Sequence, residues 1–248
     1  MLEPTIKKTT NTSVVILAAG FGMRLKNNKP KALVELSTNK TILDYQVEKI
    51  SKYIPVDNIS VVVGYKKKLV EKAHPELKFV YNDAYDKTNT GKSLLAAVNT
   101  LKGGHLLWLN GDVVFDEMIV PKILATTASE NSCVLVDNKR CGEEEVKYDL
   151  DRHGKIIQLS KTVKNPKGES LGINLLLHKD IPLFKRHLAL IGDTDYFEKA
   201  LENMISEGAR LDPVYTNGLF CAEIDFPQDL EEVQNYLRTP KREPALVK

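Results

Sequence analysis

Cysteine is scarce in this chain. Its 248 residues include only Cys133, Cys141 and Cys221, and no two of them form a CxxC pair. A sparse and odd number of cysteines predicts neither a disulfide framework nor a zinc site. Free thiols in such small number are typical of a reducing compartment, so the expected location is the cytoplasm.

Long apolar runs and strong charge of one sign are lacking as well. No segment approaches the ~20 apolar residues that span a bilayer, and the first 12 residues lack the apolar core of a signal peptide. The net charge is only +2 and the lysines are spread along the chain, unlike the basic patch of a nucleic-acid binder. We therefore expect neither a membrane nor a nucleic acid as partner.

Apolar and charged residues occur in ordinary proportions, 42% and 27%, as in globular proteins. The first half is predicted to alternate strands (13–18, 58–65, 77–82, 105–115, 132–137) with helices (41–54, 67–75, 90–101, 117–127). Such alternation indicates an α/β fold with a mainly parallel sheet. The second half is predicted to hold a hairpin over 143–161, a strand over 170–178, helices over 193–208 and 227–239, and one or two short strands over 211–225.

The domain organisation follows from these patterns, because no Gly/Ser-rich linker or repeat interrupts them. We expect a single domain over 13–238, whose second part, 138–238, forms a sheet-rich lobe on the first part, 13–137. The ends, 1–12 and 239–248, are predicted to be flexible, since terminal segments without apolar periodicity seldom pack.

The first predicted strand runs into a glycine turn, Gly20-Phe21-Gly22, which is followed by Arg24 and Lys31. A dinucleotide fingerprint needs a third glycine, and Leu25 stands in its place. Backbone N–H groups of a small-residue turn can hold phosphate oxygens, while Arg supplies a donor fork and Lys a point charge. Two cations beside such a turn favour a triphosphate over a purely structural turn.

A second glycine motif, Thr90-Gly91-Lys92-Ser93, resembles the end of a Walker A loop. That loop requires its first glycine at position 86, where this chain has Asp86. We therefore interpret the segment as a polar loop that caps a helix near a ligand.

Two aspartates, Asp112 and Asp225, directly follow apolar runs. Ligands of open α/β sheets lie beyond the carboxyl ends of strands. One or two carboxylates together with substrate phosphates form the usual protein site for Mg²⁺. The pair is therefore a candidate magnesium site, although each aspartate alone could be a helix cap.

The segments "LAAGFGMRL", "KPKAL", "NGD" and "EIDFPQDL" together resemble the nucleoside-triphosphate transferases that make nucleotide sugars and CDP-alcohols. The resemblance covers about residues 13–238 and implies a Rossmann-like three-layer α/β/α fold. Its sheet would be mixed and mainly parallel, with a small β-rich acceptor lobe. Residues 13–137 would bind the nucleotide and 138–238 the acceptor. One departure is Asn39-Lys40, where the family has a glycine.

The segments "YNDAYDKTNTGKSL", "EEEVK" and "DYFEKAL" look most similar to the small cytidylyltransferases acting on phosphocholine, phosphonates or similar compounds. That resemblance implies a Mg²⁺-dependent transfer of CMP from CTP to a small phosphorylated acceptor. Arg24, Lys31 and Lys161 would be catalytic, and Asp112 and Asp225 would hold the metal. The nucleotide would contact Leu17, Ala18, Ala19, Gly20, Phe21, Gly22, Arg24, Lys31, Asn82, Thr90, Ser93, Asn110 and Gly111. The acceptor would contact Lys147, Lys161, Glu169, Asp195 and Tyr196.

Several alternatives stay open at this point. A sugar-1-phosphate nucleotidylyltransferase using UTP, dTTP or GTP is one, and a non-catalytic nucleotide sensor is another. Asp195 and Tyr196 could meet a cationic head group, whereas Lys139 and Arg140 leave room for a second anionic group on the acceptor. The residues at 143–145 could be no more than a solvated hairpin edge. The sequence does not fix the oligomeric state, and a homodimer is compatible with it.

Overall fold

The computed structural model describes residues 8–25, 29–36 and 39–239. Most of the predicted N-terminal extension and nearly all of the predicted tail lie outside these residues. In the described part, nine strands form one sheet, whose main path has the order β10-β6-β9-β4-β1-β2-β3. None of the described helices is long and apolar enough to cross a membrane.

The first half builds the parallel part of the sheet, as predicted. It contains β1 (Thr12–Ala18), β2 (Ile59–Val63), β3 (Lys78–Tyr81) and β4 (His105–Asn110), which pair in parallel as β4-β1-β2-β3. The helices between them are α1 (Ile42–Ser51), α2 (Lys67–Ala73) and α3 (Thr90–Val98). The strands are almost continuous apolar runs because both faces of the sheet are covered.

The prediction of one strand over 105–115 is wrong. The chain leaves the sheet at Gly111, and β5 (Val113–Phe115) pairs with β11 (Cys221–Glu223) in a separate two-stranded ribbon. A Cβ at Gly111 would lie 2.5 Å from the carbonyl oxygen of Leu17, so glycine allows the chain to turn off beside β1. The break places Asp112 at a corner between two sheets.

The second half continues the same sheet. After α4 (Ile119–Leu124), β6 (Ser132–Asp137) and β10 (Leu211–Tyr215) pair in parallel, while β9 (Gly168–Leu176) lies antiparallel between β6 and β4. The predicted hairpin is present as β7 (Lys147–Leu150) and β8 (Ile156–Ser160). Helices α6 (Phe197–Ser206) and α7 (Pro227–Arg238) match predicted helices, whereas α5 (Ile181–Leu190) was not predicted.

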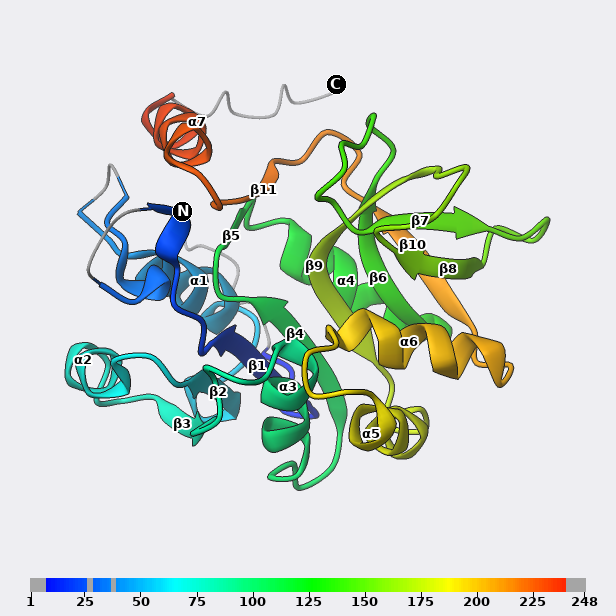
Figure 1. Ribbon diagram of the computed structural model, residues 1–248, viewed down its shortest axis with the longest axis horizontal. Coiled ribbons are helices and arrows are strands. Elements are labelled where there is room, and N and C mark those ends of the chain that lie inside the picture. Colours follow the sequence, from blue (N-terminus) through cyan, green and yellow to red (C-terminus); the bar gives the residue numbers. More distant parts are fainter. Residues whose placement is uncertain (1–7, 26–28, 37–38, 240–248) are drawn as a thin grey trace, which may run out of the picture.

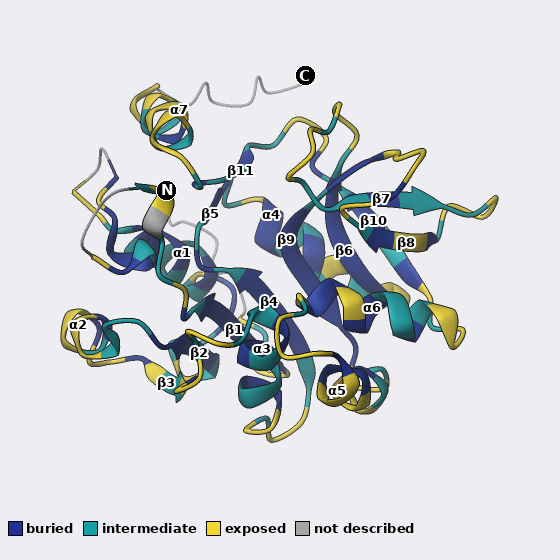
Figure 2. Cartoon of the chain, in the orientation of Figure 1, coloured by how far each residue is buried: buried dark blue, intermediate teal, exposed yellow. Residues whose placement is uncertain are grey.

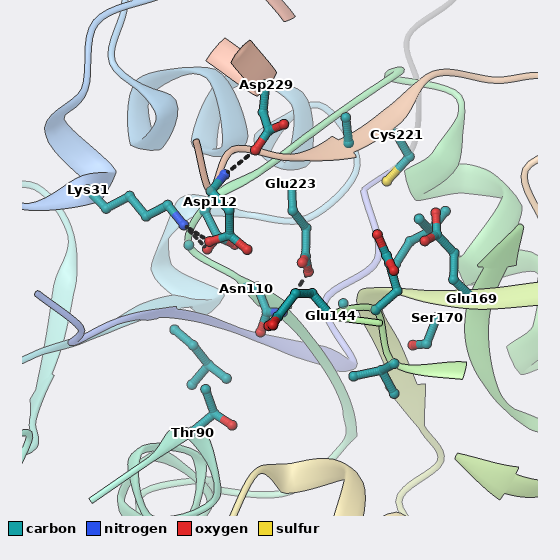
Figure 3. Close-up of a pocket in the computed structure, with 18 of the residues that line it drawn as sticks. Lys31, Thr90, Asn110, Asp112, Glu144, Glu169, Ser170, Cys221, Glu223 and Asp229 are labelled. Carbon is teal, nitrogen blue, oxygen red and sulfur yellow. Dashed lines mark hydrogen bonds and ion pairs between the residues drawn. The ribbon is translucent and has the colours of Figure 1, made fainter. Parts of the chain in front are cut away.

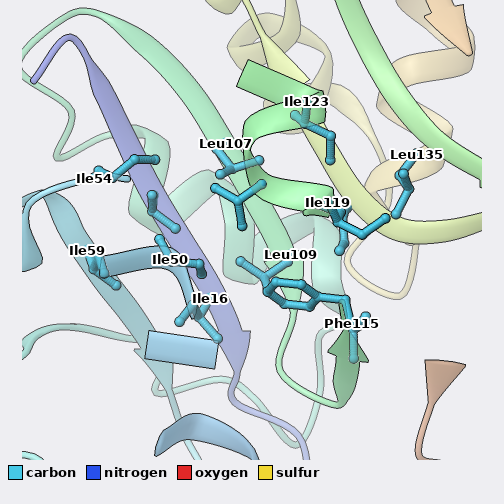
Figure 4. Close-up of a cluster of buried hydrophobic side chains, with 14 of the residues drawn as sticks. Ile16, Ile50, Ile54, Ile59, Leu107, Leu109, Phe115, Ile119, Ile123 and Leu135 are labelled. Atoms are coloured by element: carbon cyan, nitrogen blue, oxygen red, sulfur yellow. The ribbon is translucent and has the colours of Figure 1, made fainter. Parts of the chain in front are cut away.

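Helices cover both faces of the sheet, which gives the three layers (Figure 1). On one face α3, α5 and α6 pack around Trp108, whose ring stacks on Phe184 at 5.1 Å and meets Phe197 edge-on at 5.5 Å. On the other face α1 and α4 cover a second apolar cluster, which includes Ile16, Leu109 and Ile119 (Figure 4). Buried residues follow the central strands, and exposed ones follow the outer faces of the helices (Figure 2).

The departure at Asn39-Lys40 is accommodated without glycine. Asn39 adopts a left-handed backbone with φ +55°, a conformation that asparagine tolerates better than most residues. Thr41 then caps α1 in a capping box with Asp44, whose backbone N–H donates to the threonine hydroxyl at 3.1 Å. The helix therefore begins where the family resemblance implies.

Candidate active site

A cleft of about 1180 Å³ opens at the carboxyl ends of β1 and β4 and extends toward the second half of the sheet. Many predicted site residues line it: Leu17, Ala18, Gly20, Phe21, Gly22, Arg24, Lys31, Thr90, Asn110, Gly111, Asp112, Lys161, Glu169, Tyr196 and Asp225. The other predicted residues are not part of its lining: Ala19, Asn82, Ser93, Lys147 and Asp195.

Three charged residues from distant segments meet in the cleft, and two of them, Lys31 and Asp112, are labelled in Figure 3. The ammonium of Lys31 lies 2.6 Å from Oδ2 of Asp112, 81 residues away, and 2.7 Å from Oδ1 of Asp225, 194 residues away. Burial alone would lower the pKa of Lys31, but the two carboxylates outweigh it, so the pKa lies above its ordinary value. Lys31 is therefore held in the charged form.

The two aspartates are brought together by backbone pairing. In the ribbon of β5 and β11, Val113 lies opposite Glu223, and the N–H of Ile224 donates to the carbonyl of Asp112 at 3.0 Å. The amide of Gln46, a buried residue of α1, donates to the carbonyls of Asn110 and Val113 and so fixes the corner that carries Asp112.

Asp225 is held by the start of α7. Its backbone N–H donates to Oδ2 of Asp229 at 2.8 Å, while Asp229 also accepts from Phe226 as a helix cap. The "EIDFPQDL" pattern thus has a local purpose, because its second aspartate positions the first.

The glycine turn lies directly against Lys31. Gly22 has φ +62°, and a Cβ there would lie 2.9 Å from Cβ of Lys31. Glycine is required both for this backbone conformation and for this close approach. On the outer side of the turn, the Phe21 ring contacts Tyr65 and Tyr85, with centroids 5.2 and 5.1 Å away.

Arg24 and Lys161 face each other across the mouth of the cleft, and Glu144 lies between them. Its Oε2 is 3.9 Å from Nη2 of Arg24 and 3.2 Å from Nζ of Lys161. Arg24 also lies 3.6 Å from Asp225 and over the ring of Phe226. From the sequence alone, the acidic segment at 143–145 could be a solvated hairpin edge. In the structure its Glu144 connects Arg24, from the first half of the chain, with Lys161, from the second.

Two further carboxylates in the cleft escaped sequence reasoning. Glu223 accepts from the Asn110 amide at 2.9 Å, and partial burial, with Asp112 as the next cause, raises the pKa of Glu223 to about 8. Glu198, at the start of α6, is 7% exposed. Alternation along a strand could have indicated Glu223, because it stands two residues before Asp225 and shares its face.

Asn82 and Ser93 are joined by a hydrogen bond beside the cleft. The Asn82 amide donates to the hydroxyls of Thr88 and Ser93, both at 2.9 Å, and both Asn82 and Ser93 are buried. Lys92 of the Walker-like segment points away from the cleft and caps α5, donating to the carbonyl of Ile191 at 2.7 Å. The rejection of a P-loop agrees with this geometry.

Two of the predicted acceptor residues contact each other, and the other three bond to different parts of the protein. Tyr196 and Lys161 are in contact, with Nζ of Lys161 5.6 Å from the ring centroid. Asp195 instead closes its own loop by accepting from the N–H of Gly192 at 2.7 Å, and Lys147 donates to the carbonyl of Lys161 at 2.9 Å. Glu169 is buried and paired with Lys139 at 2.8 Å.

A family model described as a MobA-like NTP transferase domain matches residues 14–210. The chain belongs to this family. "Bifunctional protein GlmU" of Francisella philomiragia is 37% identical to this NTP transferase over 129 residues, which are 51% of this chain and 28% of that protein. The chain thus spans little more than a quarter of that curated relative.

Solved structures share the fold of this NTP transferase at low sequence identity. CTP:phosphocholine cytidylyltransferase (LicC) of Streptococcus pneumoniae matches 92% of this chain and 100% of its own, with a TM-score of 0.76 and 20% identity. The inositol-1-phosphate CTP transferase of T. maritima covers 92% of this chain with a TM-score of 0.73 and 17% identity. A putative glucose-1-phosphate thymidylyltransferase of Bacillus anthracis also gives a TM-score of 0.73 at 16% identity. The resemblance to nucleoside-triphosphate transferases and the mixed, mainly parallel α/β sheet are confirmed.

Proposed function

We propose that this NTP transferase is a Mg²⁺-dependent cytidylyltransferase that moves CMP from CTP to a small phosphorylated or phosphonate acceptor. The observation that carries the proposal is the meeting of Lys31 with Asp112 and Asp225 beside the glycine turn, with Lys161 facing them across the cleft. The two solved neighbours named as CTP-using enzymes cover most of this chain, which supports CTP as the donor.

The residues present fit a magnesium ion that binds together with the nucleotide. Oδ1 of Asp112 is buried and has no hydrogen-bond partner among the described residues, so one carboxylate oxygen is available. The described residues contain no group of three or more His, Cys, Asp or Glu side chains that could hold a metal. Two carboxylates completed by phosphate oxygens are a typical set for Mg²⁺. When bound, the ion would neutralise charge on the reacting phosphates.

In the proposed reaction an oxygen of the acceptor phosphate attacks the α-phosphorus of CTP, and the bond from that phosphorus to the β-phosphate oxygen breaks. Diphosphate leaves, and the product carries CMP on the acceptor. No general base is needed, because the second pKa of a phosphate monoester is about 6 and its oxygen is already anionic. The chain must instead position two anions and offset their charge.

Each cation has a place in this scheme. Lys31 would donate to the α-phosphate once its two carboxylates engage the metal, and Arg24 would bind the departing diphosphate. Lys161 would bind the phosphate of the acceptor. Backbone N–H groups of the turn at 20–22 would hold the phosphate chain, as small-residue turns do.

A second candidate is a sugar-1-phosphate nucleotidylyltransferase using UTP, dTTP or GTP. The 37% identity to GlmU over half of this chain supports it, as does the thymidylyltransferase among the fold neighbours. The non-catalytic sensor has less support, because Arg24, Lys31, Asp112 and Asp225 are all present and gathered.

Diphosphate release separates these candidates. The purified chain is incubated with Mg²⁺, each of four NTPs, and a panel of phosphorylated alcohols, phosphonates and hexose 1-phosphates. Release with CTP and a small alcohol phosphate or phosphonate supports the cytidylyltransferase. Release only with a hexose 1-phosphate and another NTP selects the sugar enzyme. Nucleotide binding without diphosphate release for any pair of NTP and acceptor would favour the non-catalytic sensor.

A further inference from the structure

One carboxylate at the acceptor end of the cleft has a buried oxygen without a hydrogen-bond donor. Glu198, the second residue of α6, lines the cleft and is 7% exposed. Its Oε2 is buried and has no hydrogen-bond partner among the described residues. Burial raises the pKa of Glu198 to about 7, while Lys161 nearby acts to lower it. A buried oxygen without a donor is unfavourable, so this oxygen is suited to a donor that a ligand brings.

The charge of the cleft favours a positive group on that ligand. Ten of its described lining residues are Asp or Glu, and only four are Lys or Arg. Lys31 and Arg24 lie at the glycine-turn end, Lys139 is paired with Glu169 at 2.8 Å, and Lys161 faces the acceptor phosphate in the proposed function. The lining therefore disfavours a second anionic group on the acceptor.

The chemistry around Glu198 selects the kind of cation. The ring of Tyr196 is already approached by Lys161 at 5.6 Å, and the ring of Phe197 is buried against Trp108. A quaternary ammonium prefers open aromatic faces and has no N–H for Oε2 of Glu198. A primary ammonium has three N–H donors and can satisfy the unpartnered oxygen.

We propose that Glu198 is the ammonium-binding residue of the acceptor subsite. The acceptor is a small zwitterion whose phosphate or phosphonate binds Lys161 and whose primary ammonium donates to Glu198. The spacer between the two groups is short, because Lys161 is near enough to Glu198 for its charge to act on the carboxylate. This inference rests on the proposed function and narrows its acceptor to one chemical class.

The test compares acceptors that differ only at the amine. Diphosphate release is measured with CTP and Mg²⁺ for 2-aminoethyl phosphate, ethyl phosphate and phosphocholine, with wild type, Glu198→Gln and a matched control, Glu202→Gln. Glu202 lies on the same helix but is not part of the cleft lining. We expect the lowest KM for 2-aminoethyl phosphate. Glu198→Gln should raise that KM about 10-fold or more and leave the KM for ethyl phosphate unchanged, since one charge-assisted hydrogen bond is lost.

Equal or lower KM for ethyl phosphate or phosphocholine in the wild type would overturn the proposal, even if Glu198→Gln failed to fold. An equal rise in KM for all three acceptors in Glu198→Gln would also overturn it. If no acceptor released diphosphate, the proposed function would fail, and calorimetry would then decide the subsite alone. Tighter binding of 2-aminoethyl phosphate than ethyl phosphate to the CTP-bound wild type would support the ammonium site, and equal binding would refute it.

Discussion

The ammonium of Lys31 lies 2.6 Å from Oδ2 of Asp112, and the same nitrogen also reaches Asp225. The lysine thus occupies the space between the two carboxylates that the proposed function assigns to a metal. A cation of the protein itself offsets their mutual repulsion. Under the proposed function, metal and lysine would therefore compete for the same two carboxylates until a nucleotide drew the lysine away.

The first prediction concerns turnover. Lys31→Ala and Asp112→Asn should each lower kcat on the order of 10²-fold, because the first removes a cation at the reacting phosphate and the second removes a carboxylate that would hold the magnesium ion. Diphosphate release under saturating substrate measures the change. Lys40→Ala, which removes a surface lysine paired with Glu48, is the control and should turn over like the wild type. Near-wild-type turnover in Lys31→Ala would refute the assignment.

The second prediction separates metal binding from catalysis. Without nucleotide, Lys31→Met should bind Mn²⁺ more tightly than the wild type, because the two carboxylates lose their competing cation. Asp112→Asn should bind Mn²⁺ more weakly. Electron paramagnetic resonance of free Mn²⁺ gives both affinities. Unchanged affinity in both variants would mean that the metal binds elsewhere.

The third prediction concerns Glu144, which contacts both Arg24 and Lys161. Under the proposed function, substrate phosphates would replace this carboxylate on the two cations. Glu144→Gln should therefore lower KM for nucleotide and acceptor by about 2- to 5-fold, the range expected for exposed ion pairs, with kcat unchanged. Steady-state kinetics measures it against the exposed neighbour Glu143→Gln. A raised KM would instead indicate that Glu144 helps to hold substrate.

The fourth prediction is a pH dependence of stability. An unfolded Glu223 has its ordinary pKa of 4.5, whereas the folded pKa is about 8. Between these values the folded state keeps a proton that the unfolded chain releases, so this group makes the protein less stable as the pH rises. From pH 5.5 to pH 8, these two pKa values correspond to a loss of up to about 3 kcal/mol, so wild type should lose up to about 6–12 °C more in Tm than Glu223→Gln. Thermal unfolding followed by circular dichroism checks this, with the exposed Glu231→Gln as control.

The fifth prediction is that Ser93 contributes to the stability of the fold. Ser93→Ala leaves the buried amide of Asn82 short of one acceptor and should cost about 1 kcal/mol of unfolding free energy. The relative kcat/KM for CTP and UTP should stay as in the wild type. A changed base preference without loss of stability would instead indicate that Ser93 contacts the nucleotide.

Periodicity and apolar runs were enough to predict β1, β2 and β6, because strands buried on both faces leave a clear pattern. They did not reveal that the chain leaves the sheet after β4. The meeting of Lys31 with Asp112 and Asp225 was implied only by the family resemblance. Spacing along the chain cannot reveal it, since it depends on the pairing of β5 with β11. Glu198 was missed, and Glu144 was considered only as part of a solvated hairpin edge, for a related reason. A carboxylate on a helix or hairpin is usually solvated, and only the fold shows where it faces.

The antiparallel strand β9 pairs with β6 along one side and with β4 and then β7 along the other. β9 consequently joins strands of both parts of the chain, 13–137 and 138–238, in one sheet. Separate expression of 13–137 and 138–238 would leave β4 and β6 as apolar open edges, which are templates for aggregation. Fragment complementation of this chain should therefore succeed only if the two pieces are refolded together.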